Sequence, residues 1–152
     1  MTQPIHTRYA DAEPLVFPGA ITLKVLLSGR DTGGALAVFE DLVEPGVGPG
    51  RHIHHEQDEA FFFLEGRFDV EVDGVLHHVE PGDVAFVPRG TIHAFKNVGT
   101  TTGRIRYLFT PALGIEEMFR AFYEALEAGD LDADSMAEIA MQYGQEFVGP
   151  PL

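Results

Sequence analysis

Residues 46–97 contain two short stretches in which glycine, proline, histidine and glutamate recur at fixed spacing. The first reads GVGPGRHIHHEQDEAFFFLEG, and the second reads GDVAFVPRGTIHAFKN. The GVGPG segment cannot continue a helix and Ile53 is β-branched, so a strand is favoured at this point. Because side chains alternate along a strand, His52 and His54 project from the same face. The two stretches therefore indicate a β fold that gathers histidines on one face.

Residues 15–110 read as short strands separated by turn signals. Asp73-Gly74 lies between two alternating runs and is the strongest hairpin signal, because a type I′ turn needs positive φ at both positions. Gly33-Gly34 is a second signal of this kind. Many short strands at this spacing predict an antiparallel all-β sandwich or jelly roll rather than a βαβ fold. The expected strands are residues 21–27, 35–42, 52–54, 59–64, 68–72, 75–79, 83–87, 93–97 and 104–110.

After Pro111 the apolar residues recur at helical spacing, and Gly129 is positioned to end the first helix. Ser135 and Glu138 predict a capping box at the start of a second helix, which Gly144 ends. Neither helix has a core of its own, so both are expected to pack on the barrel. The prediction is one domain over residues 1–152, with a barrel core over about 15–110 and helices over about 114–144. The periodic apolar residues of the first helix are Ile115, Met118, Phe119, Phe122 and Leu126.

The two stretches match both motifs of the cupin superfamily, G-x5-H-x-H-x4-E-x6-G and G-x5-P-x-G-x2-H-x3-N, at all ten specified positions. Through the run HIHHEQDEAFFFLEG the chain resembles single-domain cupins of the quercetin dioxygenase-like (cupin 2 conserved barrel) group. This resemblance implies an antiparallel double-stranded β-helix, or jelly-roll, barrel. It also implies that one metal ion is bound by His52, His54, Glu59 and His93.

These donors, three imidazoles and one carboxylate, suit a divalent transition metal: iron, nickel, manganese, zinc or copper. Glu59 is preferred over its neighbour Asp58 because only Glu59 stands at the motif position; Asp58 is expected to serve a turn. His55 should point away from the site if the strand continues through it. His77 and His78 lie mid-strand without the context of a ligand.

Three histidines and a carboxylate leave coordination positions open, unlike a closed structural zinc site. The resemblance implies that Glu59 also accepts a proton from the substrate. Phe61, Phe63 and Phe95 share faces with Glu59 or His93, so they are predicted to line a pocket for an aromatic or enolic substrate, although each equally fits a barrel core. The predicted function is a quercetinase-like dioxygenase. The alternatives are an isomerase, cyclase or lyase on the same site, and a non-catalytic cupin that binds a small molecule.

The charge balance and composition restrict the partners. Ten basic residues stand against 24 acidic ones, a formal net charge of −14, which disfavours nucleic acid and anionic membranes. The chain has no cysteine, and its N-terminus lacks the pattern of a leader peptide, so cytoplasmic residence is expected. Outward-facing Phe62 and Leu64, together with the common pairing of cupins, predict a homodimer. The acidic residues after Pro111 are expected to form a solvated helix surface.

Overall fold

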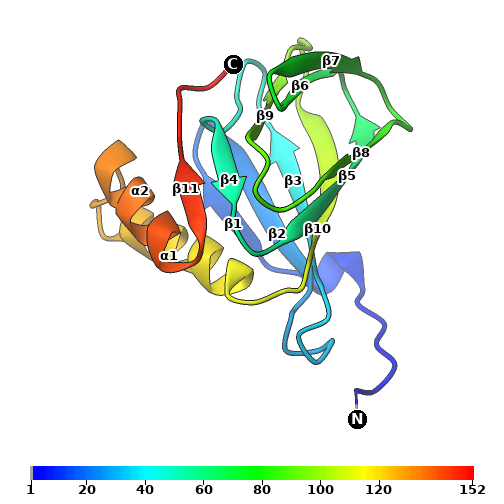
Figure 1. The fold of residues 1–152 in the computed structure, drawn as a ribbon. Coiled ribbons are helices and arrows are strands. Elements are labelled where there is room, and N and C mark those ends of the chain that lie inside the picture. The colour runs from blue at the N-terminus through cyan, green and yellow to red at the C-terminus, as the bar shows by residue number, and fades with distance from the viewer. Residues whose placement is uncertain (1) are drawn as a thin grey trace.

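Two antiparallel sheets face each other across a shared core (Figure 1). The structure is a computed structural model that describes residues 2–152. The six-stranded sheet has the order β1-β2-β3-β10-β5-β8, and the five-stranded sheet has the order β11-β4-β9-β6-β7. The strands are β1 (Pro14–Phe17), β2 (Ile21–Leu27), β3 (Ala37–Val43), β4 (His52–His54), β5 (Asp58–Glu65), β6 (Phe68–Val72), β7 (Val75–Val79), β8 (Val84–Val87), β9 (His93–Asn97), β10 (Gly103–Thr110) and β11 (Gln145–Phe147).

The predicted antiparallel jelly-roll barrel is confirmed, and its strands agree with the predicted ones apart from one or two residues at some ends. Asp73 and Gly74 adopt φ of 49° and 77°, as a type I′ turn between β6 and β7 requires. Two strands were not predicted. These are β1, which pairs with β2, and β11, which pairs with β4.

The barrel core is built from aromatic side chains on alternate residues of three neighbouring strands. Tyr107 of β10 lies opposite Phe39 of β3 and Phe61 of β5. The ring centroids are 5.6 Å apart for the first pair and 6.0 Å apart for the second. This alternation buries one face of each strand and leaves the other face for solvent or for polar pairing.

The two predicted helices are present as α1 (Ile115–Glu127) and α2 (Ala133–Gln142). Helix α1 packs on the barrel, and the ring of Phe119 lies 5.1 Å from that of Phe39. The predicted capping box is wrong by three residues, because Asp132 is the N-cap and Ser135 is its partner. Asp132 accepts a hydrogen bond from the Ser135 amide, and the Ser135 hydroxyl accepts one from the Asp132 amide. An aspartate caps a helix as well as a serine does, so the sequence allowed either start.

The chain does not end at the second helix. Gly144, with φ of 78°, reverses the chain after α2, and β11 then runs antiparallel to β4 (Figure 1). Helix α2 lies beside β11, at the edge of the five-stranded sheet, and α1 lies beside β1, at the edge of the six-stranded sheet. Within residues 2–152, neither helix has the length and apolar character needed to cross a membrane.

Candidate metal centre

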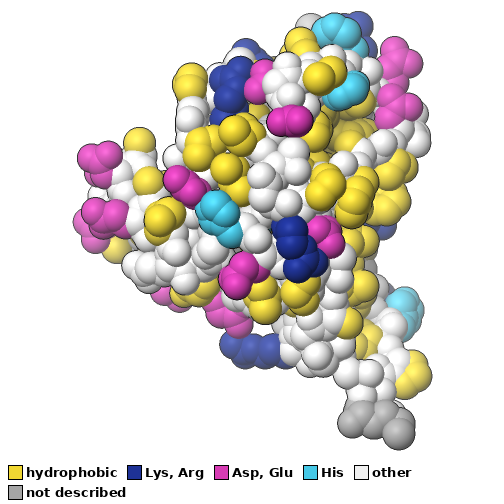
Figure 2. Space-filling model, viewed as in Figure 1, with side chains coloured by type: hydrophobic (Ala, Val, Ile, Leu, Met, Phe, Trp, Pro, Cys, Tyr) yellow, Lys and Arg dark blue, Asp and Glu magenta, His cyan; other side chains and the backbone are white. Residues whose placement is uncertain are grey.

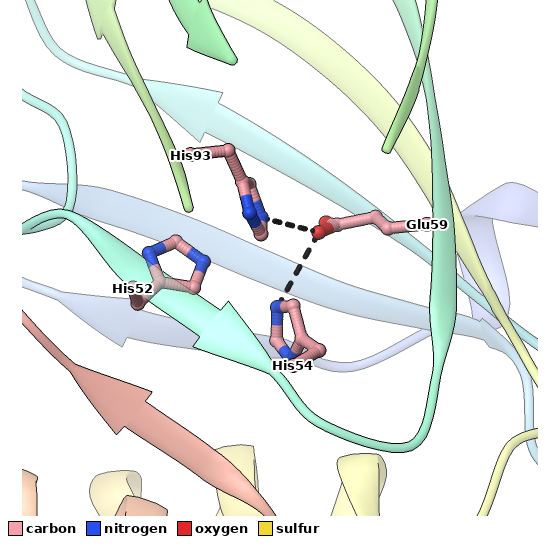
Figure 3. A group of neighbouring side chains, drawn as sticks. All are labelled: His52, His54, Glu59 and His93. Atoms are coloured by element: carbon pink, nitrogen blue, oxygen red, sulfur yellow. Dashed lines mark hydrogen bonds and ion pairs between the residues drawn. The ribbon is translucent and has the colours of Figure 1, made fainter. Parts of the chain in front are cut away.

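The four predicted ligands come from three strands and point toward one another (Figure 3). His52 and His54 lie on β4, Glu59 on β5 and His93 on β9. Each offers one nitrogen or oxygen atom, and these four atoms lie within 4.8 Å of one another. All four residues are buried, with exposed fractions between 1% and 6%. The tertiary structure therefore gathers residues that lie as far apart in the sequence as His52 and His93.

Backbone carbonyls fix the orientation of two of the three imidazoles. Nδ1 of His52 lies 2.8 Å from the carbonyl oxygen of Gly50, and Nδ1 of His93 lies 3.0 Å from that of Thr91. An imidazole that donates from Nδ1 presents the lone pair of Nε2 on its other side, which is the usual arrangement of a metal-binding histidine. Nδ1 of His54 has no hydrogen-bond partner among the described residues.

Glu59 stays ionised although only 3% of it is exposed. Burial by itself raises the pKa of this carboxyl, but hydrogen bonds from His54 and His93 outweigh burial and bring the pKa of Glu59 to about 2. Burial also lowers the pKa of His52 well below its ordinary value, so this ring is neutral at pH 7. A buried negative charge beside a neutral ring needs a positive charge nearby.

The contacts of His93 test whether a cation fits. Its Nδ1 faces the carbonyl of Thr91, and its Nε2 lies 2.9 Å from Oε2 of Glu59. A neutral imidazole can donate from only one nitrogen. Two arrangements therefore satisfy both contacts: a protonated His93, or a neutral His93 with a cation between Nε2 and the carboxylate. The second arrangement also suits Nε2 of His54, 3.3 Å from the same oxygen, so the donor set fits a divalent metal ion.

The neighbouring polar residues lie outside this group, as the strand register predicts. The His55 side chain is 49% exposed and lies 2.8 Å from Glu146. Asp58 was expected in a turn but begins β5, where it pairs with Arg89 and accepts a hydrogen bond from the Arg89 amide. His78 is exposed and pairs with Asp69 of the adjacent strand.

The predicted pocket residues pack together in the barrel core. Phe61 and Phe63 are each 1% exposed, and Phe95 is 7% exposed. The Phe61 ring lies 5.9 Å from that of Phe95 and 6.2 Å from the imidazole of His93. The Phe61 ring therefore borders the candidate centre, all three rings fill the core, and their role as a substrate pocket stays a prediction.

A second buried polar pair, Tyr107 and Asp41, was missed in the sequence. The Tyr107 hydroxyl donates to Oδ1 of Asp41 at 3.0 Å, and both residues are at most 4% exposed. Burial raises the pKa of Asp41 to about 8, and the nearby charge of Glu59 adds to this effect. Asp41 alternates with buried Phe39 and Val43, and this alternation was the available signal that it faces inward.

Comparison with known proteins identifies the fold family. Residues 39–110 match the family described as the cupin domain. This stretch of the chain is a cupin domain. A solved RmlC-like cupin from Shewanella frigidimarina is 25% identical, with a TM-score of 0.62 over 74% of this chain and 96% of that one.

Two further likenesses concern proteins described as enzymes. The quercetin 2,3-dioxygenase of Bacillus subtilis is 27% identical over 106 residues, which are 68% of this chain and 31% of that protein. This chain therefore spans about a third of that relative. A solved cupin from Silicibacter pomeroyi, described as a sugar phosphate isomerase, is 26% identical with a TM-score of 0.59, over 72% of this chain and 77% of that one.

Proposed function

We propose that His52, His54, Glu59 and His93 bind one divalent transition metal ion, and that this centre catalyses the oxygenation of an enolic or aromatic substrate, as a quercetinase-like dioxygenase. The proposal depends on one observation: three imidazoles and one carboxylate, all buried, offer donor atoms within 4.8 Å of one another. A bound metal ion lowers the pKa of a hydroxyl that coordinates it and stabilises the resulting anion. The likeness to quercetin 2,3-dioxygenase supports the class of reaction.

Glu59 is proposed both as a ligand and as the acceptor of the substrate proton. Hydrogen bonds from His54 and His93 bring its pKa to about 2, so the carboxylate is ionised at neutral pH and able to bind a cation. An enolic or phenolic hydroxyl is more acidic than an ordinary alcohol, so its proton passes more readily to a carboxylate. This difference in acidity favours substrates with an enolic or phenolic hydroxyl over those with an ordinary alcohol.

Phe61, Phe63 and Phe95 are proposed as the apolar wall of the substrate site. The support is the ring of Phe61 beside His93 and the burial of all three side chains. A wall of aromatic rings suits a planar substrate, because rings stack or meet edge to face.

The test begins with metal analysis of the purified protein, followed by oxygen uptake with a panel of flavonols and catechols. The expected result is about one bound metal ion per chain and metal-dependent uptake of oxygen with at least one enolic substrate. The proposed dioxygenase activity is wrong if the metal-loaded protein converts such a substrate without consuming oxygen.

A second candidate function, on the same site, is a metal-dependent isomerase, cyclase or lyase. The likeness to the Silicibacter pomeroyi cupin described as a sugar phosphate isomerase favours it, and such reactions also begin with a proton transfer to a base such as Glu59. A non-catalytic small-molecule-binding cupin is the third candidate, and the near-complete burial of the four residues supports it. Turnover without oxygen uptake distinguishes the second candidate, and tight metal binding without turnover distinguishes the third.

We also propose a homodimer formed through the outer face of β5 and β8. Phe62 and Leu64 of β5 are 39% and 38% exposed, and Val84 and Phe86 of β8 are 61% and 60% exposed. Phe62 lies directly opposite Val84, so the exposed side chains form one apolar surface, seen at the right of Figure 2. Light scattering at micromolar concentration should give twice the chain mass. Phe86→Ser should shift the mass toward that of the monomer.

Two further proposals concern the domain organisation of the chain and its location in the cell. We propose that the helices belong to the same domain as the barrel, supported by Met118 of α1, which is fully buried in the common core. Cytoplasmic residence is proposed because the chain has no cysteine with which to form a disulfide. Cell fractionation tests the second proposal.

A further inference from the structure

The strand that carries two of the four proposed ligands is held mainly by a strand that follows the helices. Strand β4 pairs with β9 at a single position, His52 opposite His93. With β11 it pairs along its whole length, from Gln145 opposite His54 to Phe147 opposite His52. Strand β11 lies outside residues 39–110, the part that matches the cupin family. Figure 1 shows it as the red strand beside β4.

Backbone hydrogen bonds extend this pairing beyond both ends of β4. The amide of His55 donates to the carbonyl of Gly144 at 2.9 Å, and the amide of Val148 donates to the carbonyl of Arg51 at 2.8 Å. The Arg51 guanidinium also donates to the carbonyl of Pro150 at 2.9 Å. The segment 144–150 is therefore bonded to β4 and to the residue on either side of it.

Both ends of this segment are anchored elsewhere in the protein. The Arg51 guanidinium makes two bonds to the Glu71 carboxylate of β6, at 2.6 Å and 3.1 Å. At the other end, Tyr143 packs so closely on Gly114 that a Cβ there would lie 2.8 Å from the ring. The segment is thus fixed to β6 on one side and to the start of α1 on the other.

Strand β11 also contacts the surroundings of His52. The ring of Phe147 lies 5.8 Å from the imidazole of His52. Gly50 accepts the hydrogen bond from Nδ1 of His52, and a Cβ at Gly50 would lie 2.9 Å from the carbonyl oxygen of Gly149 and 3.4 Å from the Phe147 ring. A side chain at Gly50 would therefore push β11 away from the residues that orient His52.

We propose that β11 positions His52 and His54, that Phe147 shields His52 from water, and that together they determine how long the metal ion is retained. The inference rests on the metal binding in the proposed function and not on any substrate. Away from β11, the backbone of the three-residue strand β4 is held, among the described residues, only by its pairing with β9 at His52 and by the bond from the Gly90 amide to the His54 carbonyl, so its orientation depends on β11 as the second neighbour. Groups that orient metal-binding histidines typically contribute about 10–100-fold to metal affinity.

The experiment measures the release of Zn²⁺ from the loaded full chain into excess chelator. Phe147→Ala and Gly50→Ala should release zinc about tenfold faster than wild type, at the lower end of the range for such groups. Phe147→Leu keeps an apolar cover and should stay near the wild-type rate. Val148→Ala is the matched control, because its side chain is 41% exposed on the same segment. Circular dichroism establishes that each variant is folded.

A second measurement uses the unaltered protein, so it does not depend on the folding of a variant. If β11 and the metal ion stabilise the same strand, Zn²⁺ should slow hydrogen exchange at the amides of His55 and Val148. Two results together would overturn the role of β11 while leaving the metal centre intact. They are unchanged hydrogen exchange at both amides, and wild-type zinc release by folded Phe147→Ala and Gly50→Ala. A wild-type chain that takes up no divalent metal overturns the metal centre, and the inference with it.

Discussion

Two buried glutamates, Glu59 and Glu40, place the same side chain in very different electrostatic surroundings. Glu59 is 3% exposed and lies among three histidines. Glu40 is 1% exposed, on β3, and accepts hydrogen bonds from Arg104 and Arg106. Both carboxyls have a lowered pKa although burial alone raises it, because the hydrogen-bonding neighbours stabilise the ionised form.

The neighbours differ in whether they carry a permanent charge. The guanidinium groups beside Glu40 are always protonated, so the two arginines neutralise that carboxylate at any physiological pH. Beside Glu59, burial keeps His52 neutral, and the carbonyl bond at Nδ1 of His93 leaves its Nε2 to face the carboxylate. A buried carboxylate therefore indicates a ligand site when its neighbours supply donor atoms without a fixed counter-charge.

The largest expected effect in this comparison is the loss of turnover in Glu59→Gln. The amide can no longer accept the substrate proton, so turnover per bound metal ion should fall by about 10²–10⁴-fold, as is typical when a general base is removed. Glu40→Gln should turn over at the wild-type rate per bound metal. The measurement is initial rate on a confirmed substrate, divided by metal content of the same sample. A wild-type rate for Glu59→Gln would limit Glu59 to the role of a ligand.

The next largest effect concerns metal affinity, which should depend on the histidines around Glu59 and not on the arginines around Glu40. Replacing His52, His54 or His93 by Ala removes a donor atom and should weaken metal binding by more than about 100-fold, beyond the effect of altering an outer neighbour. His55→Ala should leave affinity nearly unchanged, because its side chain points toward Glu146 and solvent. Titration with a competing chelator measures the affinities. Equal losses in His54→Ala and His55→Ala would contradict the register of β4.

Glu40 is expected to affect the free energy of unfolding rather than metal binding. Glu40→Gln weakens its bonds to Arg104 and Arg106 and should lower the free energy of unfolding by about 1–3 kcal/mol. The same variant should keep the stabilisation by zinc, about 2.7 kcal/mol at one hundred times the dissociation constant. Denaturant unfolding with and without Zn²⁺ measures both quantities. Loss of the zinc effect in Glu40→Gln would mean that the two clusters are coupled.

The last prediction concerns the pH dependence of stability and Asp41, the third buried carboxyl. Burial raises its folded pKa to about 8, above the unfolded value near 3.9. The folded protein therefore binds an extra proton between these values, and the stability that this proton gives is lost as the pH rises from about 4 to 8, by at most about 1.4 kcal/mol per unit. Asp41→Asn should flatten this part of the profile, measured by denaturant unfolding from pH 5 to pH 8.

Residue spacing predicted which face of β4 carries His52 and His54, whereas Glu59 and His93 joined the predicted centre through the resemblance to the cupin motifs. Alternation along β4 predicted that His52 and His54 share a face and that His55 does not, and the structure agrees. The Asp73-Gly74 turn and the helical period after Pro111 were equally readable. These features depend on local geometry, in which two or four residues fix the direction of a side chain.

Only the tertiary structure decided how that centre is held and neutralised. Strand β11 is three residues long, too short to show a period, and it forms because the edge of β4, about 90 positions earlier in the chain, needs a hydrogen-bonding partner. Whether Glu40 or Glu59 meets a permanent positive charge likewise depends on which strand lies next to it. Sequence fixes the face a residue occupies, whereas its neighbours across the sheet, and therefore its charge state, are long-range contacts that no local pattern encodes.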